Sequence, residues 1–130
     1  MGLNDYFKDI ILISFGAVLG ANTRFLIYKR LDQLNLSKNR IILLINILAS
    51  FSLGLFLSLV AKIDAQIYSD QLKLLFSIGL LGSLSTFSSF ICNLYDLFIK
   101  LKFKIAFKLF IISLTSGVLA FAVGFLLFMQ

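Results

Sequence analysis

The chain has 130 residues, 60% of them hydrophobic, and a mean hydropathy of +1.02. This apolar fraction exceeds the roughly 45–50% of soluble domains and indicates a membrane protein. Histidine is absent and Cys92 is the single cysteine, which excludes Ser/His/Asp or Cys/His catalysis and argues against a zinc site or a disulfide framework. The net charge of +6 comes from basic residues between apolar runs, which favours contact with membrane lipid and argues against nucleic acid.

Four apolar runs follow one another along the chain, at about residues 10–28, 41–61, 74–99 and 107–129. A transmembrane helix needs ~20 apolar residues to cross a hydrocarbon core of ~30 Å, and all four runs are long enough. The connections between them are short and leave no room for a soluble domain. Residues 1–130 are therefore expected to form one all-α membrane unit with four transmembrane helices.

The first run contains GAVLG at residues 16–20 and Arg24 near its end. Glycines four residues apart share a helix face and allow a neighbouring backbone to approach closely. The spacing leaves open whether the neighbour belongs to the same chain or to another subunit.

The second run contains Asn46, within NILASFSLG at residues 46–54. Polar side chains inside membrane spans are costly and often functional. Asn46 either supplies a hydrogen-bond donor to an ion path or bonds two helices together.

The third run carries GLLGSLSTFSSF at residues 79–90, which combines two glycines with five hydroxyl side chains. Such a stretch favours a broken helix, because glycine permits unusual dihedral angles and hydroxyls satisfy freed backbone groups. An intact helix with hydroxyls bonded to their own carbonyls is the alternative. Phe87 and Phe90 share a face if helix resumes, and their positive ring edges could line a path for a small anion.

No acidic residue lies deep in any run, whereas an exporter of cations or cationic drugs needs a buried carboxylate. Basic residues are distributed unequally between the two sides. Eight lie in the first and third connections, and three lie on the opposite side: Lys29, Arg30, Lys38, Arg40, Lys100, Lys102, Lys104 and Lys108, against Lys8, Lys62 and Lys73. The positive-inside rule then predicts a multi-pass protein of the cell membrane, with these two connections in the cytoplasm and both termini outside.

These motifs, in this order, resemble the Fluc/CrcB family of small fluoride channels. GAVLGANTRF at 16–25 is similar to the family's first-helix glycine–arginine pattern, and NILASFSLG to its second-helix pattern. GLLGSLSTFSSF resembles the third-helix signature, and SLTSG at 113–117 the serine–glycine spacing of the fourth. The resemblance covers nearly the whole chain.

The resemblance implies passive export of fluoride through two narrow pores of an antiparallel dimer, with a sodium ion buried where two broken third helices cross. It assigns roles to eight residues of this chain. Asn46, Phe87, Phe90, Ser89 and Ser113 would line the pore, backbone carbonyls of Gly82 and Ser85 would bind Na⁺, and Arg24 would be structural or lie at a vestibule. A small multidrug-type exporter and a non-conducting assembly subunit are the alternative functions.

Three residues depart from the family pattern: Asn93 replaces a glutamate, Leu109 a tyrosine and Ala49 a glycine. An antiparallel dimer needs one subunit in each orientation, whereas the unequal basic charge predicts one orientation for this chain. We therefore expect its partner to be a homologous second subunit of opposite topology. A homodimer with dual topology is the alternative.

Overall fold

The computed structural model of the protein describes residues 3–62, 69–85 and 87–127, and nearly all of them are helical. The helices are α1 Leu3–Asp32, α2 Lys38–Lys62, α3 Ser69–Leu72, the π-helix η1 Lys73–Leu81, α4 Gly82–Leu84, α5 Phe87–Ile99 and α6 Phe103–Leu126. The third predicted span, residues 74–99, thus falls within η1, α4 and α5, and α3 precedes it. Residue 86 of that span and residues 128 and 129 of the fourth lie outside the described residues.

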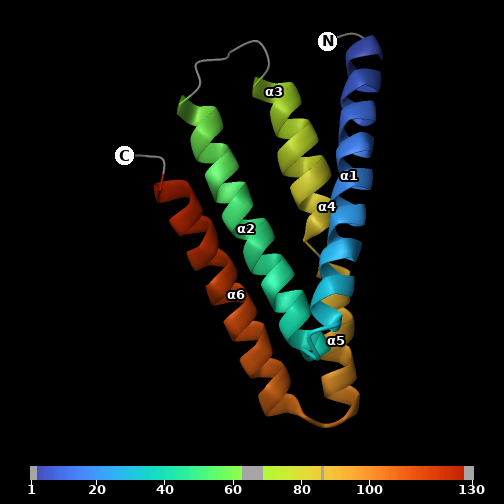
Figure 1. Ribbon diagram of the computed structural model, residues 1–130, viewed down its shortest axis with the longest axis vertical. Coiled ribbons are helices and arrows are strands. Elements are labelled where there is room, and N and C mark those ends of the chain that lie inside the picture. The colour runs from blue at the N-terminus through green and yellow to red at the C-terminus, as the bar shows by residue number, and fades with distance from the viewer. Residues whose placement is uncertain (1–2, 63–68, 86, 128–130) are drawn as a thin grey trace.

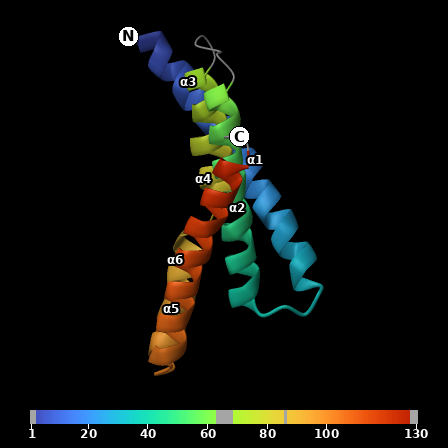
Figure 2. The same ribbon diagram turned by 90° about the vertical axis from the view of Figure 1, so that its left-hand side faces the viewer.

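In the part of the chain that the structure describes, four helical spans are long and apolar enough to cross a membrane, which confirms the all-α membrane class. They run up and down in turn, as Figures 1 and 2 show. The connections α1–α2 and α5–α6 lie at one end of the molecule, and α1 begins and α6 ends at the other. The eight basic residues of these two connections and their flanks therefore belong to the same end.

The first span packs along η1 through glycines. A Cβ atom at Gly16 would overlap the carbonyl oxygen of Leu75, and one at Gly20 would overlap that of Leu80. A Cβ at Gly79 would come within 2.8 Å of the Ile13 carbonyl oxygen. The GAVLG motif therefore serves a close contact within the chain, which settles the question that its spacing left open.

The second and fourth spans form a similar pair. A Cβ atom at Gly54 of α2 would overlap the carbonyl oxygen of Phe121, and one at Gly124 of α6 would overlap that of Phe51. Without a hydrophobic driving force between helices in lipid, close backbone packing is a main source of association. The subunit thus contains two tightly packed pairs, α1 with η1 and α2 with α6.

The third span is broken after Leu84. Ser85 has the extended dihedral angles φ −71° and ψ 147°, and helix resumes at Phe87. Gly82 instead has ordinary helical angles, φ −63° and ψ −39°, and no glycine in the described residues has a positive φ. The break is confirmed, but the glycines do not supply its unusual dihedrals as expected. Gly79 serves close packing instead, and the turn away from helix occurs at a serine.

Candidate functional site

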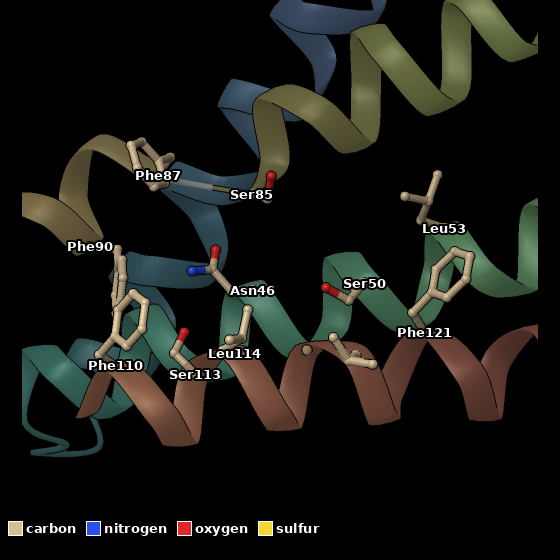
Figure 3. Close-up of a pocket in the computed structure, with 12 residues that line it drawn as sticks. Asn46, Ser50, Leu53, Ser85, Phe87, Phe90, Phe110, Ser113, Leu114 and Phe121 are labelled. Atoms are coloured by element: carbon tan, nitrogen blue, oxygen red, sulfur yellow. The ribbon is translucent and has the colours of Figure 1, made fainter. Parts of the chain in front are cut away.

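A groove of about 500 Å³ lies beside the break in the third span. Figure 3 shows that α2, α5, α6 and the segment at Ser85 contribute its walls. Its lining consists of Asn46, Ser50, Leu53, Ser85, Phe87, Phe90, Phe110, Ser113, Leu114, Gly117, Val118 and Phe121. The walls are mainly apolar, with three serine hydroxyls and one amide placed among them and no charged side chain.

The polar side chains of the groove come from three parts of the chain. Asn46 and Ser50 are one turn apart on α2, and Ser113 lies on the facing surface of α6. In Figure 3 the Asn46 amide points from α2 into the groove, toward the side on which Ser85 and Phe87 lie. This arrangement places amide and hydroxyl donors around a space that the break in the third span keeps open.

The two phenylalanines of the groove have different surroundings. Phe90 is half-buried and stacks on Phe110 of α6, with ring centroids 6.4 Å apart and an interplanar angle of 28°. Phe87, the first residue of α5, is 77% exposed. Both rings line the groove, but only Phe90 has its position fixed by a described aromatic neighbour. Most of the Phe87 surface is not covered by other described residues of the chain.

Ser89 lies apart from the groove. It lines a second pocket, of about 250 Å³. The other residues that line this pocket are Arg24, Phe25, Tyr28, Lys38, Ile42 and Ile45. Adjacent helical residues are separated by a rotation of ~100°, so Ser89 and Phe90 face different spaces. The structure thus brings four of the five predicted pore residues to one groove and places Ser89 beside two cationic side chains.

Arg24 of α1 contacts the last helical turn before the break in the third span. Its Nη1 donates a hydrogen bond to the Ser83 carbonyl oxygen over 3.3 Å. A carbonyl in the last turn of a helix lacks an intrahelical partner, so the guanidinium satisfies an otherwise unpaired group. Arg24 is half-buried, and the same side chain lines the second pocket. It therefore has a structural contact and also contributes positive charge to that pocket.

The carbonyl groups that precede the break end a helical segment whose dipole places partial negative charge there. The Gly82 carbonyl oxygen accepts a long hydrogen bond of 3.3 Å from the Ser85 hydroxyl, and the Leu81 oxygen accepts one from the Ser85 amide at 3.1 Å. Gly82 is exposed in the subunit. Carbonyl oxygens are suitable ligands for a hard cation. The described residues contain no group of three or more His, Cys, Asp or Glu side chains that could hold a metal instead.

Several residues around the site were not predicted from the sequence. Ser50 and Phe110 could have been found, because they lie four residues after Asn46 and three before Ser113 on the same helix faces.

Asn93 is only 4% exposed, and its Nδ2 has no hydrogen-bond partner among the described residues. It lies four residues after Ser89, on the face of α5 that the second pocket shares. The sequence marks it only as a departure from the family pattern.

The fold and the groove define a multi-pass membrane protein with a mainly apolar groove that holds a few amide and hydroxyl side chains. Residues 11–125 match the family described as CrcB-like protein, Camphor Resistance (CrcB), and the chain belongs to this family. It is 57% identical over 120 residues to "Fluoride-specific ion channel FluC 2" of Prochlorococcus marinus strain NATL2A, covering 92% of this chain and 97% of that protein.

Two further relatives extend the comparison. "Fluoride-specific ion channel FluC" of Ignicoccus hospitalis is 32% identical over 117 residues, covering 90% of this chain and 92% of the relative. "Fluoride-specific ion channel FluC 1" of the same Prochlorococcus strain, NATL2A, is 34% identical over 129 residues, covering 95% and 92%. One strain thus has two numbered relatives of this chain, and they differ clearly in their similarity to it.

Proposed function

We propose that the protein is a subunit of a fluoride-selective channel that lets fluoride leave the cytoplasm passively. The observation that carries this proposal is the meeting of Asn46, Ser113, Phe87 and Phe90 in one uncharged groove beside the helix break. Membership of the CrcB family and the names of the relatives support fluoride as the ion.

The chemistry of the groove suits a small, strongly hydrated anion. Removing water from such an ion is costly unless hydrogen-bond donors replace it. The Asn46 amide and the Ser113 hydroxyl supply donors, and the edges of the phenylalanine rings add a weak positive field. A fixed positive charge in the groove would hold the ion too tightly, and conduction requires sites that the ion can leave.

The second pocket would serve as a vestibule of this path. Arg24 and Lys38 make it cationic, and Ser89 adds a hydroxyl. Positive charge at the entrance raises the local concentration of anions without entering the conducting groove. Because Arg24 is bonded to the Ser83 carbonyl, its charge stays at this position.

The carbonyl oxygens of Gly82 and Ser85 would bind Na⁺ at the break. The donor set fits, because these oxygens lie at the negative end of a helical segment and Gly82 is exposed on the subunit surface. A cation shared with a second subunit would offset the repulsion between two such ends. Its role would be structural and outside the ion path.

The channel would be an antiparallel dimer with a homologous second subunit. The unequal distribution of basic residues favours one orientation for this chain, with the α1–α2 and α5–α6 connections in the cytoplasm and both termini outside. The presence of "FluC 1" and "FluC 2" in one strain supports a pair of different subunits. Phe87, which is mostly exposed in this subunit, would then complete a path together with the partner.

Fluoride efflux from liposomes tests the function. The chain and a FluC 1-type second subunit are reconstituted together and separately, and released fluoride and chloride are measured with ion-selective electrodes. We expect the pair to release fluoride, retain chloride and exceed either chain alone. Absence of fluoride release from the pair, or equal chloride release, would contradict the proposal.

A labelling experiment in cells distinguishes the two kinds of dimer. Tags at the termini of this chain are labelled in intact cells and in inverted membrane vesicles. One-sided labelling is expected for a subunit of fixed orientation. Equal labelling from both sides, with full efflux by this chain alone, would establish a dual-topology homodimer instead.

A further inference from the structure

A cleft lies between α5 and α6, lined by residues of both helices. The turn that joins these two helices is at the lower end of Figure 1. The volume of the cleft is about 250 Å³. Six apolar residues line it: Leu94, Phe98, Phe103, Ala106, Phe107 and Phe110. No polar side chain contributes to its walls, so it differs from both pockets of the proposed ion path.

The turn keeps the two helices close at this end. The Leu101 amide donates to the Phe98 carbonyl oxygen at 2.9 Å, and the Lys102 amide donates to that of Leu97 at 2.9 Å. With φ of 54° at Leu101, these bonds form a Schellman motif that ends α5 abruptly. Across the turn the rings of Phe98 and Phe103 lie 5.5 Å apart. Because Phe98 and Phe103 both line the cleft, one end of it lies beside the three turn residues 100–102.

Four exposed lysines lie in this turn and in the first turns of α6, namely Lys100, Lys102, Lys104 and Lys108. Lys102 and Lys104 flank Phe103, and Lys108 follows Phe107. Among the described residues the one ion pair is Lys73 with Asp70, so none of the four lysines has an acidic partner there. An apolar cleft next to four exposed lysines matches a ligand with an apolar tail and an anionic head.

We propose that this cleft binds an anionic phospholipid, with an acyl chain between α5 and α6 and the phosphate among the four lysines. Basic pockets between transmembrane helices are known to accept anionic head groups. Since acyl chains are as apolar in bulk lipid as in the cleft, the apolar walls do not select one lipid over another. Selection arises from the lysines, and the cleft fixes where the selected lipid lies.

The absence of tryptophan from the chain allows a direct measurement. Phe107→Trp places the one tryptophan of this chain in the cleft, at a side chain that is 68% exposed, and any tryptophan of the second subunit is replaced by phenylalanine. The matched control is Leu119→Trp on the same helix. Leu119 is 65% exposed and lines neither the cleft, the groove nor the second pocket. Each variant is reconstituted as the assembled channel, and quenching by brominated phosphatidylglycerol is compared with quenching by brominated phosphatidylcholine.

At the Phe107→Trp probe we expect anionic lipid to bind about tenfold more strongly than zwitterionic lipid, and at Leu119→Trp about equally. Adding Lys102→Gln and Lys104→Gln should reduce the preference at the first probe to about twofold. Lys29→Gln with Arg30→Gln removes the same charge at the α1–α2 turn and should leave it unchanged. Elution of each variant as a dimer confirms folding, and this readout does not depend on fluoride conduction.

Three results would overturn the proposal. Equal quenching by the two lipids at the cleft probe would mean that the lysines do not select a head group. An equal loss of preference in the Lys29→Gln/Arg30→Gln variant would mean that only net charge matters. No quenching by either lipid would mean that the partner subunit fills the cleft.

Discussion

The two halves of the third span are held in different ways. On the N-terminal side, η1 packs along α1 so closely that backbone atoms meet at Gly16, Gly20 and Gly79. On the C-terminal side, α5 touches α6 mainly through side chains, including the stacked rings of Phe90 and Phe110. The comparison indicates that the first half anchors the break while the second half leaves open the groove that side chains then line.

The largest expected effect comes from the anchored half. Gly16→Ala adds a Cβ that would overlap the Leu75 carbonyl oxygen and lie 3.0 Å from the Gly79 Cα, so α1 and η1 must separate. We expect a loss of about 2–3 kcal/mol of stability, at the upper end of overpacking effects. Thermal unfolding of the detergent-solubilised dimer measures it.

The matched control for this prediction is Gly117→Ala on α6. A Cβ there would lie 3.6 Å from the Ser50 Oγ, an ordinary contact. Replacing glycine by alanine within a helix is favourable by up to ~1 kcal/mol, so this variant should be neutral or more stable. Similar losses of stability in both variants would show that α1 and η1 pack no more tightly at Gly16 than the helices around Gly117 do.

The groove provides the next prediction. Phe90→Ile removes a ring that lines the groove and stacks on Phe110, and should slow fluoride efflux at least about tenfold, or about 1.4 kcal/mol in the barrier. Phe15→Ile is the same substitution at an exposed site on α1 away from the groove. We expect it to conduct normally. Unchanged efflux in Phe90→Ile, with the dimer intact, would exclude this ring from the path.

Sodium binding at the break should depend on the shape of the backbone more than on the side chain of Ser85. Gly82→Val places a branched side chain beside a carbonyl proposed to bind Na⁺, and we expect the sodium needed for half-maximal efflux to rise about tenfold. Ser85→Ala removes only the 3.3 Å hydrogen bond to the Gly82 carbonyl oxygen, worth about 0.5–1.5 kcal/mol.

Efflux measured over a series of sodium concentrations, with an organic cation as the replacement, separates the two variants. If Ser85→Ala raises the sodium requirement as much as Gly82→Val does, the ligand is the hydroxyl rather than the backbone.

The sequence predicted the four spans and favoured the break over an intact helix, because apolar length and hydroxyl clustering are local signals. The contribution of α6 to the site, through Ser113, was expected only from the family resemblance. The sequence did not predict that η1 is a π-helix, since the choice of hydrogen-bond pattern depends on packing against α1. Nor could it place Ser89. The direction in which each side chain of α5 faces depends on where helix resumes after Ser85, and only the assembled segment fixes that point.

Substitutions of two serines should have the smallest effects, and they compare the groove directly with the second pocket. Ser113 lines the groove and Ser89 lines the cationic pocket. If the dehydrated part of the path is the groove, Ser113→Ala removes a donor that replaces water there and should slow efflux about fivefold, as expected for one hydrogen bond of ~1 kcal/mol. At Ser89 the ion keeps more of its water and two cations remain, so Ser89→Ala should slow efflux by less than about twofold. Single-vesicle efflux rates resolve this difference. A larger effect at Ser89 than at Ser113 would move the narrow part of the path to the second pocket.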